Sequence, residues 1–265
     1  MKIVSQIYEI QTPEEALLMA ESGVDNIGSV VTDKNSFLKD KELKAAVDTV
    51  KKNKKTSSVI PLFSDFDKIM QLADYLEPDI LHFCESLVFE DEYQEKKAWE
   101  NFYELQHKIK TRNSGLKIMR SIPVISDQAD IKDKEISKEK VVLLNNIFYE
   151  VSDFFLTDTF FPAGEDKQPV PGFIGITGKT CDFDIAGLLI KISKIPVILA
   201  GGLSPENVYD AVTSLKPYGA DSCTNTNAVD ENGINIRFRK DKNKVAKFIK
   251  EIKRAEQDFK NLNSY

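Results

Sequence analysis

Short runs of β-branched and apolar residues alternate along the chain with longer stretches of helical period. The runs with the length of strands cover residues 2–8, 26–31, 59–63, 80–84, 116–124, 154–157, 196–200 and 220–224. Each run is followed by a stretch that predicts a helix, over residues 12–22, 39–54, 67–75, 90–111, 138–151, 183–192, 205–215 and 242–260. This alternation is typical of βαβ units in a parallel sheet.

Eight such units in 265 residues predict an α/β fold of the (β/α)8 TIM barrel class. A doubly wound open sheet is the alternative, because periodicity alone does not show that the sheet closes. No Pro/Gly/Ser-rich linker divides the sequence, so we expect residues 1–265 to form a single domain. Residues 160–171 and 228–240 are expected to be irregular loops on the C-terminal face, where barrels carry active sites. We expect the mixed-charge stretch 127–140 to be solvated surface.

Composition and charge narrow the class of function. With 36 Lys and Arg against 42 Asp and Glu, the net charge of -6 argues against nucleic acid as a partner. Only three Cys and no leader-like segment predict a cytoplasmic protein, and the apolar runs are too short to cross a membrane. The two His, His82 and His107, form no cluster for a metal, and no nicotinamide or flavin motif is present. We therefore expect neither a metal nor a cofactor.

Two glycine-rich segments carry the strongest chemical signal. Residues 175–180 read Gly-Ile-Thr-Gly-Lys-Thr and precede a helix, and residues 200–207 follow the seventh strand directly. Glycines let backbone amides approach a phosphate, and the start of a helix adds partial positive charge. The loops after strands seven and eight are also the usual phosphate site of this barrel. Phosphate binding is favoured over the alternative, a glycine turn that only connects strand to helix.

Several motifs resemble those of phosphoribosylanthranilate isomerases. The family has a GGTGKTFDW loop, a GGLxPENV loop and an RPxGVDVSSGVE segment, which residues 177–183, 199–208 and 217–221 resemble. Its PEDA, AEAGAD and LGF elements are matched more loosely by residues 13–16, 20–25 and 27–28. The resemblance implies a barrel that converts a phosphorylated aminoaldose into an aminoketose by an Amadori rearrangement, without a cofactor, in tryptophan biosynthesis. We expect a small phosphorylated substrate and a monomer or homodimer.

Glycine loops and resemblance together give the candidate phosphate site. Its residues are Gly175, Gly178, Gly201, Gly202, Cys223, Thr224 and Asn225. The last three stand where the family has SSG, and Thr and Asn still provide hydrogen-bond donors for a phosphate.

The rearrangement needs an acid that protonates the ring oxygen and a base that takes the proton from C2. The resemblance implies that Asp158 is the acid, because it matches the Asp of the family's LLDT motif at the end of the sixth strand. A turn or capping role is the alternative, since Asp commonly follows a strand for that reason.

The base is where the sequence departs from the family. Aligned on residues 13–16, the family's catalytic Cys becomes Tyr8, its preceding Lys becomes Gln6 and its following Gly becomes Glu9. A phenol with a pKa of about 10 is a far weaker base than a thiolate. Stacking on a ligand or filling the barrel mouth is therefore favoured for Tyr8 over catalysis as a phenolate. Glu9 is the substitute candidate, although strand alternation aims it away from the side of Tyr8.

Candidate substrate contacts complete the set. The family has an Arg after the second strand that this chain lacks, and Lys34 is the only nearby cation. Arg120 lies within the fifth strand and, if it points inward, needs an anion. Gln6, Lys34 and Arg120 are the predicted contacts. The hypotheses are an isomerase of this family, a related phosphosugar isomerase, epimerase or lyase with another base, and a phosphometabolite-binding barrel without turnover.

Overall fold

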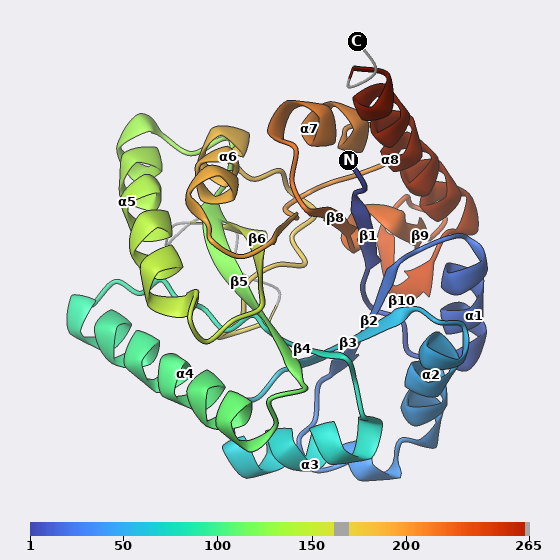
Figure 1. Ribbon diagram of the computed structural model, residues 1–265, viewed down its shortest axis with the longest axis horizontal. Helices are drawn as coiled ribbons and strands as arrows, with labels where there is room; N and C mark the ends of the chain where they lie inside the picture. The colour runs from blue at the N-terminus through green and yellow to red at the C-terminus, as the bar shows by residue number, and fades with distance from the viewer. Residues whose placement is uncertain (162–169, 263–265) are drawn as a thin grey trace.

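Eight parallel strands form a closed barrel in the computed structural model, which describes residues 1–161 and 170–262 (Figure 1). The strands are β1 (Val4–Ile7), β2 (Asn26–Val31), β3 (Thr56–Pro61), β4 (Ile80–Phe83), β5 (Lys117–Ile125), β6 (Phe154–Phe160), β7 (Val197–Leu199) and β8 (Gly219–Ser222). The barrel closes because β1 pairs with both β2 and β8. The predicted TIM barrel is confirmed, and the open sheet is excluded.

Helices surround the barrel on its outside (Figure 1). They are α1 (Pro13–Glu21), α2 (Lys41–Lys52), α3 (Phe66–Leu76), α4 (Glu92–Arg112), α5 (Ile131–Phe148), α6 (Phe183–Ile192), α7 (Val208–Leu215) and α8 (Lys242–Leu262), with short 3-10 turns η1 (Phe37–Lys39) and η2 (Thr224–Thr226). The largest apolar core lies between strands and helices, where Ile7 and Leu199 cluster with Phe248. No helix among the described residues is long and apolar enough to span a membrane.

Most helices start at a side chain that caps the first turn. Thr12 accepts a hydrogen bond from a backbone N–H of the turn that it precedes, as do Asp40, Asp65, Asp91, Asp130 and Asp182. Each such cap contributes about 1 kcal/mol. The cap at Asp130 also corrects a boundary, because the helix predicted to start at residue 138 begins at Ile131. Much of the expected solvated stretch 127–140 is thus the exposed start of α5.

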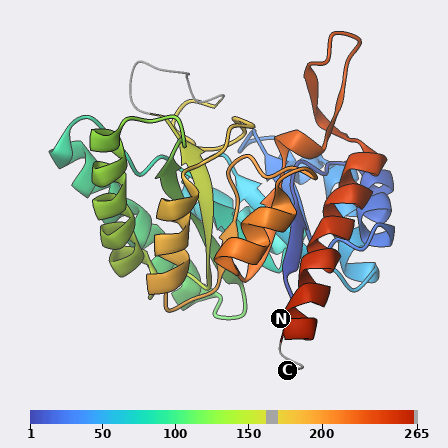
Figure 2. The same ribbon diagram turned by 90° about the horizontal axis from the view of Figure 1, so that it is seen from above.

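The segment predicted as a loop over 228–240 instead forms a hairpin of β9 (Asn227–Val229) and β10 (Asn235–Lys240). Asp230 closes its turn by accepting backbone hydrogen bonds from Asn232 and Ile234. Figure 2 shows the hairpin rising from the end of the barrel opposite the N-terminus. For the other expected loop, residues 162–169 lie outside the described residues.

Candidate active site

A pocket opens at the carboxyl ends of the strands. The predicted site residues that line it are Tyr8, Glu9, Asp158, Gly178, Gly201, Gly202, Cys223, Thr224 and Asn225. Gly175 lies just beside it, packed on Asp158. Gln6, Lys34 and Arg120 are not among the lining residues. The structure therefore brings together most of the predicted phosphate and catalytic residues, which come from strands far apart in the sequence.

Three loops, after β6, β7 and β8, meet at one side of the pocket. Asn225 Nδ2 donates to the carbonyl oxygens of Gly202, at 3.0 Å, and Gly178, at 3.4 Å. Gly202 has a φ of +72°, and a Cβ there would lie 2.5 Å from the carbonyl carbon of Lys179. Gly178 has a φ of +66° and packs on Thr224. At Gly202, backbone packs directly on backbone, which only glycine permits. We call the segments around Gly178, around Gly201 and Gly202, and around Thr224 and Asn225 the glycine loops.

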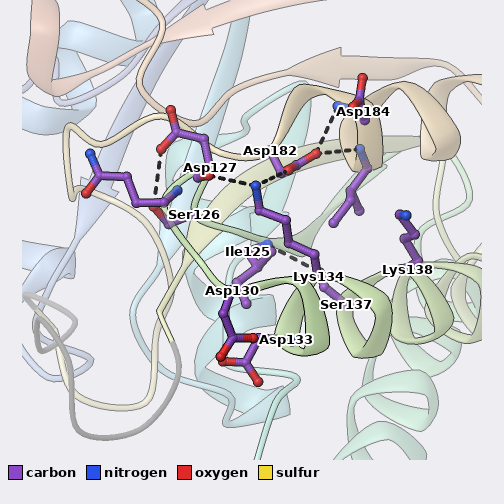
Figure 3. Close-up of polar contacts among 12 residues, drawn as sticks. Ile125, Ser126, Asp127, Asp130, Asp133, Lys134, Ser137, Lys138, Asp182 and Asp184 are labelled. Carbon is purple, nitrogen blue, oxygen red and sulfur yellow. Dashed lines mark hydrogen bonds and ion pairs between the residues drawn. The ribbon is translucent and has the colours of Figure 1, made fainter.

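The loop after β6 is anchored to the end of β5. Asp182 N donates to the Ile125 carbonyl at 2.8 Å, and Asp127 N donates to the Thr180 carbonyl at 3.1 Å. The Asp182 carboxylate caps α6 and pairs with Lys134 Nζ of α5 at 2.9 Å (Figure 3). Asp182, which matches the Asp of the family's GKTFD, therefore positions the loop from outside the pocket.

Asp158 projects from the end of β6 into the pocket. Thr159 N donates to its Oδ1 at 2.9 Å, and Gly175 folds so closely over it that a Cβ there would lie 2.2 Å from Oδ2. Loss of solvation raises the pKa of Asp158 from 3.8 to about 7. A carboxyl group with such a pKa is partly protonated at neutral pH, as a general acid requires.

Asp221, near the end of β8, is a second carboxylate in the pocket that the sequence reasoning did not single out. It is 7% exposed and accepts a hydrogen bond from Gln6 Nε2 at 3.1 Å. The pKa of Asp221 is raised from 3.8 to about 7. Burial is the main cause and the charge of Asp158 adds to it, whereas the hydrogen bond from Gln6 and the charge of Lys240 lower it. Its position could have identified it, because Asp221 ends the segment 217–221 that resembles a family motif.

Tyr8 belongs to a buried hydrogen-bonded chain across the barrel. Its hydroxyl shares a hydrogen bond with Ser58 Oγ at 2.5 Å and lies 2.8 Å from His82 Nδ1, and His82 Nε2 lies 2.8 Å from Ser121 Oγ. Burial raises the pKa of Tyr8 well above 10, and burial with the charge of Arg120 lowers the pKa of His82 to about 3. Both side chains are neutral at pH 7.

The ring of Tyr8 needs the glycine beneath it. A Cβ on Gly28 of β2 would lie 2.1 Å from a ring carbon of Tyr8. The phenol thereby packs against the backbone of the neighbouring strand and fills part of the barrel mouth.

Glu9 lines the pocket although strand alternation would turn it away. Its φ of +67° is left-handed, so β1 has already ended and the alternation no longer holds. Its carboxylate accepts hydrogen bonds from Arg237 Nε at 2.7 Å and Asn227 Nδ2 at 3.4 Å, both in the hairpin. The family's Gly at this position suits such a φ, whereas here a Glu adopts it and forms an ion pair.

Arg120 points out of the barrel, contrary to the inward side chain on which its predicted substrate contact depended. It is fully buried, donates to Glu85 Oε2 and Gln106 Oε1 at 2.7 Å each, and lies between phenylalanine rings. Glu85 supplies the anion that a buried Arg requires.

The other predicted contacts do not line the pocket, although Gln6 lies directly behind Asp221. Lys34 is exposed, and Gln6 bonds to Asp221 and Asn26 inside the barrel. Across the described ranges, no group of three or more His, Cys, Asp or Glu side chains is arranged to hold a metal ion.

Comparison with known proteins agrees with this geometry. A family model described as N-(5'-phosphoribosyl)anthranilate isomerase matches residues 120–251, which include Asp158, Asp221 and the glycine loops. The isomerase of Methanopyrus kandleri is 28% identical over 250 residues, covering 94% of this chain and 97% of that protein. Isomerase 2 of Methanosarcina mazei is 39% identical over 112 residues, 42% of each chain.

Solved structures show the same fold. The phosphoribosylanthranilate isomerase of Thermotoga maritima, in a monomeric form of a dimeric enzyme, aligns with a TM-score of 0.63 at 20% identity over 95% of this chain and 98% of that one. The Pyrococcus furiosus enzyme gives 0.63 at 18% identity, covering 95% and 99%. The family model, the curated relatives and the solved structures therefore agree on one family that this chain resembles along nearly its whole length, that of the phosphoribosylanthranilate isomerases.

Proposed function

We propose that this protein isomerises phosphoribosylanthranilate by an Amadori rearrangement, a step of tryptophan biosynthesis. The observation that carries the proposal is Asp158, a carboxyl with a pKa of about 7 that lies in the pocket at the position of the family's acid. The match of the family model across all three glycine loops supports it, since these loops and Asp158 line one pocket.

The phosphate of the substrate is assigned to the glycine loops. The backbone of Gly178, Gly201 and Gly202 lines the pocket there, and Thr224 adds a hydroxyl donor. Asn225 holds the loops together, since its amide donates to the Gly178 and Gly202 carbonyls. Backbone amides and hydroxyls bind a phosphate without a net cation, which suits a chain whose overall charge of -6 repels anions.

Asp158 is assigned to the first chemical step. Its protonated carboxyl donates to the ring oxygen, the C1–O bond breaks, and the open chain remains as a protonated Schiff base on the anthranilate nitrogen. A base then takes the proton from C2 to form the enolamine, which tautomerises to the aminoketose. The bond that breaks needs a proton at its oxygen, and Asp158 holds one at neutral pH because its pKa is raised.

A related isomerase, epimerase or lyase acting on another phosphorylated sugar is the second candidate. It is favoured by Tyr8, because a neutral phenol fixed by Ser58 and His82 replaces the family's Cys. A barrel that binds a phosphometabolite without turnover is the third.

The test is to measure turnover of phosphoribosylanthranilate by the purified protein, and rescue of a tryptophan auxotroph that lacks this enzyme. Asp158→Asn should lower kcat about 10²- to 10⁴-fold and leave phosphate affinity unchanged, because only the proton is lost. Asp48→Asn, the same change on the outer helix α2, is the matched control and should leave the rate as it is. Ligand binding without turnover in the unmodified protein would favour the third candidate.

The proposal includes one domain over residues 1–265, a cytoplasmic location and a monomer or homodimer. A dimeric form is described for the T. maritima relative, which supports including the dimer. Light scattering on the purified protein distinguishes the two states.

A further inference from the structure

We propose that Asp221 is the general base that takes the proton from C2, in place of the family's missing Cys. The inference rests on the proposed function and assigns a residue to the step that the sequence left open. Asp221 lines the same pocket as Asp158 but comes from β8, whereas Asp158 comes from β6. The two carboxylates are close enough for the charge of Asp158 to influence Asp221.

The buried neutral groups of the pocket are poor bases. Tyr8 and His82 bond to each other and to serines, so the imidazole lone pair is engaged as well as being of low basicity. Burial raises the pKa of the thiols of Cys84 and Cys223 well above 9, so neither forms a thiolate at neutral pH. Among the described lining residues, Glu9, Asp158 and Asp221 remain.

Glu9 is held by a cation. Its Oε1 lies 2.7 Å from Nε and 2.6 Å from Nη2 of Arg237, and the side chain is 1% exposed. Both carboxylate oxygens of Glu9 are therefore engaged by protein partners, Oε1 by Arg237 and Oε2 by Asn227. Since Asp158 must hold a proton to open the ring, Asp221 is left as the acceptor.

A change beside Asp221 supports the same assignment. Gln6 Nε2 donates to Asp221 Oδ1 at 3.1 Å, and Gln6 stands where the family has a Lys. The hydrogen bond from the neutral Gln6 amide lowers the pKa of Asp221, and a lysine ammonium would lower it more because its full charge favours the ionised carboxylate. The two replacements therefore fit together. With Gln6 in place of Lys, Asp221 is more basic and can act as the base that Tyr8, in place of Cys, does not provide.

The proton balance closes with these two residues. Protonated Asp158 gives its proton to the ring oxygen, and ionised Asp221 takes the C2 proton while the C2–H electrons form the C1–C2 double bond of the enolamine. The nitrogen accepts the former C=N π electrons. C1 then gains a proton as the C2 hydroxyl loses one, and exchange with water returns both carboxyls to their starting forms.

The decisive variants are Asp221→Asn and Gln6→Lys. Asp221→Asn keeps an oxygen for Gln6 and should lower kcat/KM about 10²- to 10⁴-fold, with inorganic phosphate still bound. Gln6→Lys tests the base by its pH profile. The acid-side limb of kcat/KM should move about one unit or more to lower pH, because the new cation favours ionised Asp221. The charged or titratable groups that face Asp221, namely Asp158, Lys240, Tyr8 and Cys223, are unchanged in this variant.

The outcomes separate the two proposals. Active unmodified protein with Asp221→Asn retaining a tenth or more of its kcat/KM overturns the base and leaves the proposed function standing. An acid-side limb that does not move in Gln6→Lys also overturns the base, even if Asp221→Asn fails to fold. Unmodified protein that does not turn over phosphoribosylanthranilate overturns both.

Discussion

The pocket has one side built from backbone and another built from side chains. On the side of β6, β7 and β8, glycines with positive φ let the loops pack closely. On the side of β1 to β5, Tyr8, Ser58, His82 and Ser121 form a chain of hydrogen bonds. The first side carries the family's motifs, and the second departs from them at the catalytic position.

This difference shows which part of the site can change. A backbone cradle depends on φ angles and close approach, so a side chain added there disrupts several loops at once. Side-chain networks can be rebuilt locally, because each new group needs only its own partner. Glu9 is partnered by Arg237 and Asn227, and Tyr8 by Ser58 and His82. A new base can then arise among the remaining carboxylates.

The largest effect is expected from breaking the backbone side with Gly202→Ala. The added Cβ would meet Lys179 and Thr180 backbone atoms at 2.5 to 2.6 Å at a φ of +72°. We expect a loss of about 3 kcal/mol or more in free energy of unfolding and at least tenfold weaker binding of inorganic phosphate. Urea unfolding and calorimetry measure these.

Gly233→Ala is the matched control for that variant. Its φ is +80°, but a Cβ there meets no atom within 4 Å, and it lies in the hairpin turn. It should cost about 1–2 kcal/mol from backbone strain alone and leave phosphate binding intact. Equal losses in both variants would mean that φ alone matters and that close packing of the glycine loops does not.

The two sides are also expected to have opposite effects on stability as pH changes. The folded-state pKa of Asp221 is raised from 3.8 to about 7, so the folded protein binds more protons between these values and stability falls as pH rises. The pKa of His82 is lowered from 6.5 to about 3, so stability there falls as pH drops below 6.5.

Asp221→Asn isolates one of these contributions. It should raise the free energy of unfolding at pH 8 by at most about 4 kcal/mol and change it little at pH 4, because the amide carries no charge to bury. Urea unfolding across this pH range measures the change. An equal gain at both pH values would show that the effect is not one of ionisation.

The sequence predicted the barrel better than it predicted side-chain direction. Strand β2 and helix α6 have the predicted bounds, since β-branched runs and an Asp cap mark them clearly. In β5, both faces carry buried residues, so the alternation of side chains does not show whether Arg120 points into or out of the barrel. The left-handed φ of Glu9 could not be predicted, because a Glu residue does not mark such a conformation. The hairpin was predicted only as a loop.

The sequence predicted which glycines lie at the pocket but gave no sign of the place that Asp221 takes beside them. The glycines of residues 175–180 and 200–207 are visible as residue types that a phosphate loop requires, and they line or adjoin the pocket. Asp221 is hydrogen-bonded by Gln6, which lies 215 positions away in the sequence. Such a partnership arises only when the barrel closes β8 onto β1.

The smallest effect is expected at the ion pair that links β1 to the hairpin. Arg237→Ala leaves the Glu9 carboxylate, which is 1% exposed, without its cation. The effect is limited because the Arg237 side chain is 37% exposed and solvent screens the pair. We expect a loss of about 1–2 kcal/mol in free energy of unfolding. Glu9→Gly in the same chain removes that charge and places glycine at a φ of +67°, so the double variant should recover most of the loss.

A double-mutant cycle by urea unfolding measures this coupling. Recovery in the double variant means that Glu9 tolerates its conformation because Arg237 is present, and that the hairpin supports the altered side of the pocket. If the two changes are additive, the hairpin and β1 have changed independently. The altered side of the pocket would then consist of Tyr8 and its hydrogen-bonded chain alone, because the hairpin would not stabilise that side.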